Sequence, residues 1–399
     1  MSEPALSILH EKADQAAALL RELGLDAWMT FVRETATHPD PGVELVVGVD
    51  LTWVSALLLT ARGDRVAVVG RMDVSNVQAR GVFGEVIGYD QDVRAPLRDV
   101  LSRLDPQTIA LNYSPDDHTA DGLTLGMYRL LADDLLADTP LAARLTTAAP
   151  LLARLRGRKT ATEVACLRGA IAETEAIVSR LGGLIRPGLS EREIAGAVHE
   201  QLRVRGLAPA WPAESCPLVN TGPHSEPGHS LPRDDLRVEP GHLVHIDLGV
   251  RRDGYCSDLQ RMWYVRRTGE TEPPESVRKG FATVLRAIES AAAVLKPGVR
   301  GWEVDSAARR VVVEAGYPES RHGTGHSLGR AVHDGGTLLG PPWPKYGATT
   351  ERQVEPGNVF TLELGVMTEA GYIGLEEDVL VTDGGCEFLS TPQRELWLI

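Results

Sequence analysis

The first 150 residues alternate between two spacings of apolar side chains. AALLRELGL (residues 17–25) repeats its apolar positions at helical spacing. Four short runs are rich in β-branched or aromatic residues and are bounded by turn-forming residues, so they are predicted to be strands. They are DAWMTFV (26–32), TWVSALLLT (52–60), DRVAVVG (64–70) and TIALNYS (108–114). Helices that alternate with strands predict an α/β domain.

The pattern changes near residue 150, where the basic, helix-leaning segment APLLARLRGRKTATEVACLRGA (149–170) begins. Within it, Thr160 and Glu163 have the spacing of a capping box, which is typical of a helix start. A chain of 399 residues is also long for a single core. We therefore predict two domains, residues 1–155 and 156–399.

The predicted second domain contains an internal repeat. RPGLSEREIAGAVHEQLRVRGL (186–207) aligns without a gap with KPGVRGWEVDSAARRVVVEAGY (296–317). Both segments have the pattern of a Pro-Gly turn, an amphipathic helix and a glycine C-cap. The repeat continues in two predicted strands, VEPGHLVHIDLGV (238–250) and VEPGNVFTLELGV (354–366). If the two units pack around a pseudo-two-fold axis, their matching positions will face one another.

Each of these two strands carries one acid inside an apolar run, Asp247 in the first copy and Glu363 in the second. In the following pair, GYCSDLQ and GYIGLEE, Asp258 is matched with Glu376. Four buried carboxylates would repel one another and be forced to protonate unless cations neutralised them. Carboxylate oxygens suit Mn²⁺ or a similar ion, and bridging carboxylates suit a two-ion centre. A lone buried acid is about as often a hydrogen-bonded core residue as a metal ligand. Two matched pairs of buried acids favour a metal site.

Histidines gather in the same part of the chain. Seven of the 11 lie between residues 224 and 333, several of them in the glycine-rich segments HSEPGH (224–229) and HGTGHSLGRAVHD (322–334). A lone histidine is more often a packed or capping residue. A cluster next to a predicted metal site favours metal ligation or substrate contact.

GHSLG, within the second of these segments, fits the nucleophile elbow of serine hydrolases, with Ser327 as the nucleophile. That motif requires a buried strand before it, a helix after it, and an acid and then a histidine downstream. Here YPESRHGT precedes it and Gly and Pro pairs follow, while no acid separates Ser327 from His333. We therefore reject the serine-hydrolase interpretation.

The composition narrows the class of protein further. A net charge of −14 argues against a nucleic-acid partner, which requires a basic face. The longest apolar run, WVSALLLTA (53–61), is too short to span a membrane, and no signal-peptide pattern is present at the N-terminus. The four cysteines are far apart and form no CxxC motif, so we expect reduced thiols in a cytoplasmic protein without membrane contact.

Five separated motifs resemble, in the same order, those of the pita-bread metallopeptidase family: HIDLG, GYCSDLQR, HGTGHSLGRAVHD, FTLELG and LEEDVLVT. That family includes Xaa-Pro aminopeptidases, Xaa-Pro dipeptidases (prolidases) and methionine aminopeptidases. The resemblance covers roughly residues 160–399, and the first 150 residues resemble the creatinase-type accessory domain of the proline-directed members. It implies an α/β creatinase-like N-terminal domain, followed by an α+β pita-bread catalytic domain with an internal pseudo-two-fold repeat.

The resemblance also implies a ligand set for two metal ions. Asp247 would hold one ion, and Asp258 and Glu376 would bridge both. His326 and Glu363 would hold the second ion. The adjacent Glu377 is excluded as a ligand because the family motif places the ligand at the first acid of LEED.

Further residues are assigned to substrate and catalysis by the same resemblance. The substrate-contacting histidines of the family correspond to His229 and His333, and His322 lines the same loop. The implied mechanism is metal-assisted hydrolysis through a hydroxide that bridges the ions. Glu363 would shuttle the proton, and His333 or His229 would donate to the developing oxyanion.

Four positions depart from the family pattern, namely Met262, Leu364, Met367 and Gly374. They stand where threonine, proline, tyrosine and arginine are usual, respectively. None of them removes a ligand, so we expect them to affect substrate preference more than catalysis.

The activity implied is hydrolysis of the Xaa-Pro bond of dipeptides by a homodimer that uses two divalent ions, with Mn²⁺ favoured over Co²⁺ or Zn²⁺. One alternative is an Xaa-Pro aminopeptidase that acts on longer peptides. Two others are a creatinase-like hydrolase of a small C–N compound and a non-catalytic pita-bread binding module. The last two branches lose ligands, whereas this chain keeps all five.

Overall fold

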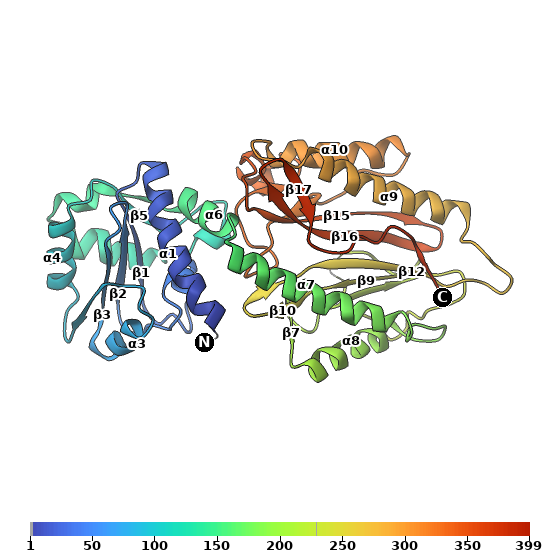
Figure 1. Cartoon of the computed structure of the whole chain (residues 1–399), viewed down its shortest axis with the longest axis horizontal. Helices are drawn as coiled ribbons and strands as arrows, with labels where there is room; N and C mark the ends of the chain where they lie inside the picture. The colour runs from blue at the N-terminus through green and yellow to red at the C-terminus, as the bar shows by residue number, and fades with distance from the viewer. Residues whose placement is uncertain (1–2, 229) are drawn as a thin grey trace. The chain divides into compact units, whose positions relative to one another are not determined.

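The computed structural model describes residues 3–228 and 230–399. The chain divides into two compact units, Met1–Arg156 and Gly157–Ile399 (Figure 1). In the described ranges, no helix is both long and apolar enough to cross a membrane.

The first unit is built on a six-stranded mixed sheet with the order β4-β3-β2-β1-β5-β6. Its strands are β1 (Ala27–Val32), β2 (Ser55–Thr60), β3 (Arg65–Gly70), β4 (Glu85–Tyr89), β5 (Ile109–Leu111) and β6 (Leu145–Thr147). β1 pairs antiparallel with β2 and parallel with β5. All four strands expected from the apolar runs are present, and the unit has the expected α/β class.

Helices pack on both faces of this sheet. They are α1 (Glu3–Leu23), α2 (Pro41–Val46), α3 (Val74–Gln78), α4 (Arg94–Leu104), α5 (Leu125–Arg129) and α6 (Ala149–Gly157), with short turns η1 (Arg71–Asp73), η2 (His118–Ala120), η3 (Leu130–Leu135) and η4 (Pro140–Arg144). Successive residues of β1 alternate between two cores: Trp28 packs with Leu20 of α1, and Met29 packs with Leu97 of α4.

The second unit is built on a seven-stranded sheet with the order β15-β16-β12-β9-β8, to which β17 adds beside β16 and β18 beside β12. These strands are β8 (Leu218–Thr221), β9 (Leu243–Leu248), β12 (Leu259–Tyr264), β15 (Val359–Thr368), β16 (Gly371–Thr382), β17 (Gly385–Phe388) and β18 (Trp397–Leu398). Short elements complete the unit: β7 (Ala208–Pro209), β10 (Val250–Arg252), β11 (Tyr255–Cys256), β13 (Gly325–His326), β14 (Leu338–Leu339), η5 (Pro344–Tyr346) and η6 (Thr349–Glu351).

Two helix pairs cover the two halves of this sheet (Figure 1). They are α7 (Ala161–Leu181) with α8 (Glu191–Arg205), and α9 (Glu275–Val294) with α10 (Gly301–Glu314). The first pair shares a core with β8 and β9, and the second shares one with β15 and β16. This duplicated arrangement is the α+β, pseudo-two-fold repeat that the sequence predicts.

The local signals of the repeat explain where its helices begin and end. Thr160 and Glu163 form the predicted capping box at the start of α7. In the two repeat copies, the backbone N–H groups of Ser190 and Arg300 donate to the glutamate three residues on. α8 ends at Arg205 and is capped by Gly206, whose φ of 65° is left-handed and therefore favours glycine over residues with a Cβ.

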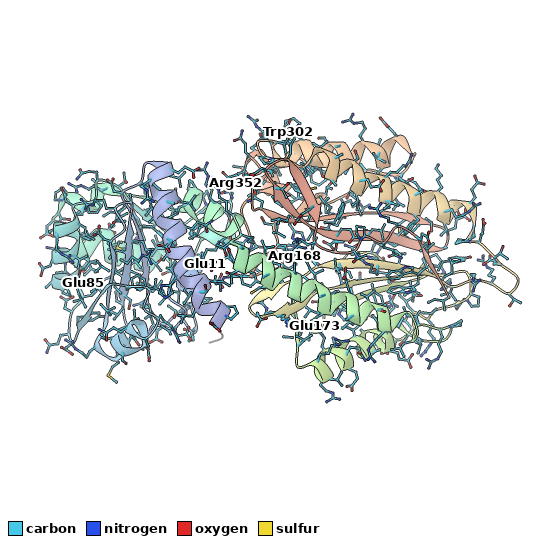
Figure 2. The ribbon with its side chains drawn as sticks, viewed as in Figure 1. Glu11, Glu85, Arg168, Glu173, Trp302 and Arg352 are labelled. Atoms are coloured by element: carbon cyan, nitrogen blue, oxygen red, sulfur yellow. The ribbon has the colours of Figure 1, made fainter. Side chains whose placement is uncertain are left out.

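Charged side chains on the surface of the second unit link its elements. Glu173 lies on α7 and is labelled in Figure 2. It accepts hydrogen bonds from Arg205 at the end of α8, at 2.8 Å, and from Arg252 on β10, at 3.2 Å. Such partly exposed pairs contribute little to stability on their own. The stability of the second unit therefore depends mainly on its apolar cores.

Candidate metal centre

Four neighbouring strands of the second unit each place one polar residue in a single row across the sheet. Asp247 on β9 lies opposite Gln260 on β12, Gln260 lies opposite Glu376 on β16, and Glu376 lies opposite Glu363 on β15. Directly opposed residues on neighbouring strands point to the same face of a sheet. Three carboxylates and one amide therefore share one face, and Asp258 joins them from the position just before β12.

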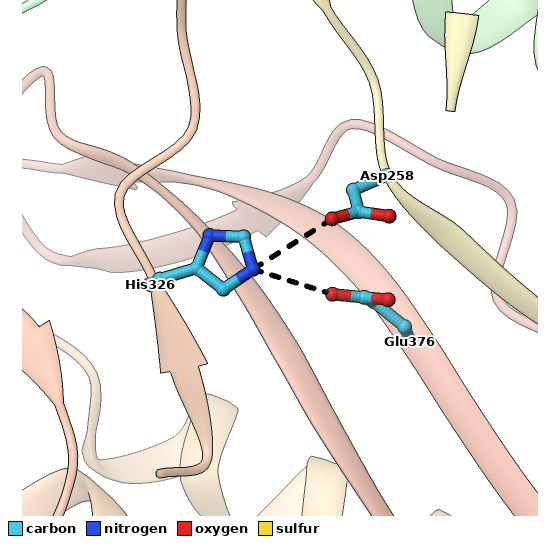
Figure 3. A group of neighbouring side chains, drawn as sticks. All are labelled: Asp258, His326 and Glu376. Atoms are coloured by element: carbon cyan, nitrogen blue, oxygen red, sulfur yellow. Dashed lines mark ion pairs between the residues drawn. The ribbon is translucent and has the colours of Figure 1, made fainter. Parts of the chain in front are cut away.

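His326, on the short strand β13, faces this row from a separate loop (Figure 3). Its Nε2 lies 3.6 Å from Asp258 Oδ2, 3.9 Å from Glu376 Oε1 and 3.9 Å from Glu363 Oε1. Ligand atoms of Asp258, His326 and Glu376 all lie within 4.8 Å of one another, and all three residues are buried. One nitrogen and several carboxylate oxygens thus converge on one point.

Burial leaves several of these oxygens without a hydrogen-bond donor. Asp258 is 5% exposed and Glu376 is 1% exposed. Among the described residues, Asp247 Oδ1, Asp258 Oδ1 and Glu376 Oε1 have no hydrogen-bond partner. A buried carboxylate oxygen without a donor is costly, so three of them in one place require a positive charge.

The pKa values of the acids reflect the same imbalance. Burial raises the pKa of Asp258 well above its usual value, and the negative charge of Glu376 raises it further. The pKa of Glu376 is raised by burial and then by the charge of Glu363. Burial and the charge of Glu363 raise the pKa of Asp247 to about 7. These shifts show that protein donors do not compensate the negative charge of the group.

The donor set fits a divalent cation. Burial lowers the pKa of His326, so the imidazole is favoured in its neutral form, which offers a ring-nitrogen lone pair to a metal. Carboxylate oxygens combined with one imidazole suit hard to borderline ions such as Mn²⁺, Co²⁺ and Zn²⁺. A cation would also supply the positive charge that the three oxygens without donors lack.

Glu377, next to Glu376, belongs to a different environment because neighbouring strand residues point to opposite faces. Its carboxylate accepts from Arg261 Nη2 at 2.9 Å, from Ser390 Oγ at 2.5 Å and from the backbone N–H of Gln393 at 3.0 Å. Glu377 is therefore held in a buried ion pair away from the carboxylate row.

The histidines assigned to substrate contact lie in different places. The ring of His333 stands edge-on to that of the candidate ligand His326, with centroids 4.4 Å apart, and His333 is exposed. His322 is also exposed, and its Nδ1 contacts the backbone oxygen of Gly323 at 2.8 Å. His229 lies outside the described residues.

A buried ion pair anchors the loop that carries His326 and His333. Lys159 Nζ lies 2.8 Å from Asp334 Oδ2, and both side chains are nearly inaccessible, 1% and 2% exposed. The backbone N–H of Asp334 donates to the carbonyl of Ser327. The loop is thus closed on itself and fixed to the start of the second unit.

Three residues of the site were missed by reasoning from the sequence. Gln260 lies in the row between Asp247 and Glu376, and Glu376 stands opposite Gln260 rather than opposite Asp258, with which the repeat had matched it. The second is Asp378, whose carboxylate accepts the backbone N–H of Asp258 at 3.2 Å. The third is Lys159. The period of two in a strand, counted on from Asp258, would have placed Gln260 at the site.

The four departures from the family pattern occupy distinct environments. Leu364 and Met262 are buried in the apolar core, whereas Met367 is 43% exposed. A Cβ at Gly374 would lie 2.6 Å from Gln260 Oε1 and 2.9 Å from His245 Nε2. Glycine is required there because side chains of this chain already fill the space.

Fold and site together define a metal-dependent hydrolase, and the comparisons with known proteins identify its family. Residues 165–383, more than half of the chain, match the model of metallopeptidase family M24. The chain belongs to this family and is a peptidase that uses divalent metal.

Individual relatives agree with this assignment. An uncharacterized peptidase of Staphylococcus aureus (strain MW2) is 28% identical over 84% of this chain and 87% of its own length. An Xaa-Pro dipeptidase of Pyrococcus furiosus is 31% identical over 61% of this chain and 65% of its own length. The structure of an Xaa-Pro dipeptidase from Bacillus anthracis superposes with a TM-score of 0.75 at 22% identity, covering 98% of this chain and 100% of the other, so it supports the fold.

Proposed function

We propose that this protein is a prolidase-like exopeptidase that hydrolyses the Xaa-Pro bond of dipeptides with two divalent ions, preferably Mn²⁺. The observation that carries the proposal is the group of buried carboxylates facing His326, in which three oxygens have no donor among the residues that the structure describes. The likeness to the Xaa-Pro dipeptidase of Pyrococcus furiosus supports the substrate class. In this proposal residues 1–155 form a creatinase-like accessory domain and residues 156–399 form the catalytic domain.

Five side chains would hold the ions. Asp247 would bind one, His326 and Glu363 would bind the other, and Asp258 and Glu376 would bridge the two. The closeness of Asp258, His326 and Glu376 supports the centre of this assignment. When bound, divalent ions polarise the scissile carbonyl and lower the pKa of a water molecule, which makes it nucleophilic near neutral pH.

The protein's own residues would supply the proton transfers. Glu363 and Asp247 are the least buried carboxylates of the row. This exposure supports a role for Glu363 as the group that takes the proton from the attacking water and passes it to the leaving amine. His333, exposed beside His326, would donate to the carbonyl oxygen as negative charge develops on it. His229 would share this role, and His322 would contact the substrate.

We further propose a cytoplasmic homodimer without nucleic-acid or membrane partners. In the described chain the four cysteines form no disulfide and three of them are buried, which supports a reducing compartment. The net charge of −14 disfavours nucleic-acid binding. Light scattering on the purified chain should give twice the mass of 43.1 kDa.

The test is to remove the metal and compare two substrates. Treatment with a chelator should abolish cleavage of an Xaa-Pro dipeptide, and added Mn²⁺ should restore it better than Co²⁺ or Zn²⁺. Faster cleavage of Xaa-Pro than of Xaa-Pro-Yaa supports a dipeptidase, and the reverse order would make the chain an Xaa-Pro aminopeptidase. Activity that survives complete removal of metal would contradict the proposal.

A further inference from the structure

Gln260 is the one neutral member of the row across the sheet, and its amide contacts two of the acids at once. Its Nε2 donates to Glu376 Oε2 at 2.9 Å and to Glu363 Oε2 at 3.1 Å. The side chain is 5% exposed. A primary amide has two N–H donors, so both are used by these two carboxylates.

A buried chain of polar side chains lies behind this amide. Gln260 Oε1 lies 2.9 Å from His245 Nε2, and His245 Nδ1 lies 3.0 Å from Asn220 Oδ1. Asn220 is held in turn, because its Nδ2 donates to the backbone oxygen of Glu226 at 3.0 Å, an atom that can only accept. A neutral imidazole has one N–H, so His245 can donate to only one of these two amide oxygens. The two carboxylate acceptors, Glu376 and Glu363, therefore set the direction of the amide nitrogen of Gln260.

The surrounding space is shaped for this chain of contacts. The ring of Tyr372 stands edge-on to that of His245, with centroids 5.0 Å apart. Any Cβ at Gly374 would meet both Gln260 Oε1 and His245 Nε2 within 3 Å. The glutamine amide therefore occupies the space that a side chain at position 374 of β16 would otherwise fill.

The two hydrogen bonds distinguish between the oxygens of each carboxylate. In both Glu363 and Glu376, Oε2 faces Gln260, whereas Oε1 faces His326 Nε2 at 3.9 Å. Glu376 Oε1 is one of the oxygens that have no donor among the described residues. We propose that Gln260 is a positioning residue of the metal centre, which holds one oxygen of each glutamate so that the other is presented to the ion beside His326.

The inference rests on the proposed function only in taking this site to bind divalent ions. Its test is calorimetric titration of MnCl₂ into the chelator-stripped full chain, without substrate. Gln260→Met keeps the size of the side chain but removes both donors, and it should weaken Mn²⁺ binding about 10- to 100-fold, the usual effect of losing an outer partner of a ligand. Gln260→Asn, whose amide is one methylene too short to reach both acids, should also bind Mn²⁺ more weakly.

Gln393→Met is the matched control. Gln393 is 3% exposed and also contacts β12, but its side-chain nitrogen donates to the backbone oxygens of Met262 and Glu395, at 2.8 and 3.0 Å. This variant should lower the melting temperature and leave Mn²⁺ affinity unchanged.

Each outcome of the titration either supports or overturns the positioning role of Gln260. Wild-type affinity in Gln260→Met, or an equal loss in Gln393→Met, overturns the positioning role while leaving the proposed function intact. Should Gln260→Met fail to melt cooperatively, Gln260→Asn decides in the same way. A wild-type chain that binds no Mn²⁺ overturns both the inference and the proposed function.

Discussion

Each of the two units buries aspartate in its core, but the surroundings of these acids differ. In the first unit, Asp40 is 4% exposed, and its Oδ1 accepts from the backbone N–H of Gly42 at 2.8 Å and from Asn112 Nδ2 at 2.7 Å. Asp40 caps α2, so its carboxylate has a local structural role. In the second unit, the comparably buried Asp258 faces Glu376 and other acids.

The comparison shows that burial alone does not identify a functional acid. Burial raises the pKa of both Asp40 and Asp258. For Asp40, hydrogen-bond donors lower the pKa and one neighbouring charge, that of Glu44, raises it. For Asp258, four neighbouring acids raise the pKa further. Among the described residues Asp40 Oδ2 also has no hydrogen-bond partner, so one such oxygen is tolerated without a cation, whereas several acids that face each other need one. A group of buried carboxylates that share too few donors is therefore the informative signal.

The largest difference between variants should be seen when Asp258 and Asp40 are each replaced by asparagine. Asp258→Asn should lower the hydrolysis rate by more than the roughly 100-fold that loss of an outer partner costs, because a ligand itself is lost. It should also lower the metal content measured by elemental analysis. Asp40→Asn should keep both within about two-fold, since an asparagine still caps a helix. Equal loss in the two variants would remove the distinction between the units.

A third kind of buried acid, Asp334, has a full cationic partner in Lys159. Lys159→Met removes the ammonium group and leaves the carboxylate buried, so it should lower the free energy of unfolding by about 3–5 kcal/mol. Denaturant titration measures this loss. The control is Arg203→Met, which breaks an exposed pair with Glu200 and should leave the free energy of unfolding nearly unchanged. Similar costs in the two variants would show that the buried pair has no special weight.

The stability of the first unit should depend on pH through Asp40. Burial raises its pKa from 3.8 to about 6, so folding favours the protonated form. This contribution is fully present below pH 3.8 and is lost as the pH rises through about 6, with a total on the order of 3 kcal/mol. Between pH 4 and 7 the wild type should therefore lose stability relative to Asp40→Asn, whose amide does not titrate. Parallel pH profiles in urea unfolding would contradict this assignment.

The smallest effect should come from Ser327, the residue of the rejected nucleophile elbow. No helix follows it before Pro344 in the described chain, so the strand–turn–helix geometry of an elbow is missing. Ser327→Ala should keep the hydrolysis rate within a few-fold. A dead Ser327→Ala enzyme, beside an active Asp258→Asn, would replace the metal mechanism with a serine mechanism.

Local patterns were sufficient for some of the elements of the fold, whereas others in the first unit, such as β4 (Glu85–Tyr89) and α4 (Arg94–Leu104), were not predicted. The strand runs of the first unit and the capping box at Thr160 depend on neighbouring residues only, and they appear where expected. The internal repeat predicted the duplicated helices because each copy carries its own local signals, a Pro-Gly turn and an amphipathic pattern. The helix predicted over residues 17–25 belongs to the longer α1, which begins at Glu3 and ends at Leu23.

The contacts around the acids depend on long-range pairing, which no local pattern records. Matching the two repeat copies set Asp258 beside Glu376, but the sheet register sets Gln260 there instead. Lys159 and Asp334 lie 175 positions apart, and neither has a sequence signal that points to the other. The acids could be recognised because carboxylates are unusual inside apolar strands. The residue types of Gln260 and Lys159 gave no comparable signal.

The order of the strands has a consequence for how the protein acquires its metal. β12, in the middle of the row, is flanked by β9 and β16, whose acids Asp247 and Glu376 come from opposite halves of the repeat. A nascent chain that ends before β15 can form β9 and β12 but lacks Glu363 and Glu376, two of the carboxylates that face His326. Because metal affinity arises only when its ligands are assembled, uptake of the ion should be a late event in biogenesis. A loaded centre would then mark a chain in which both halves have already joined.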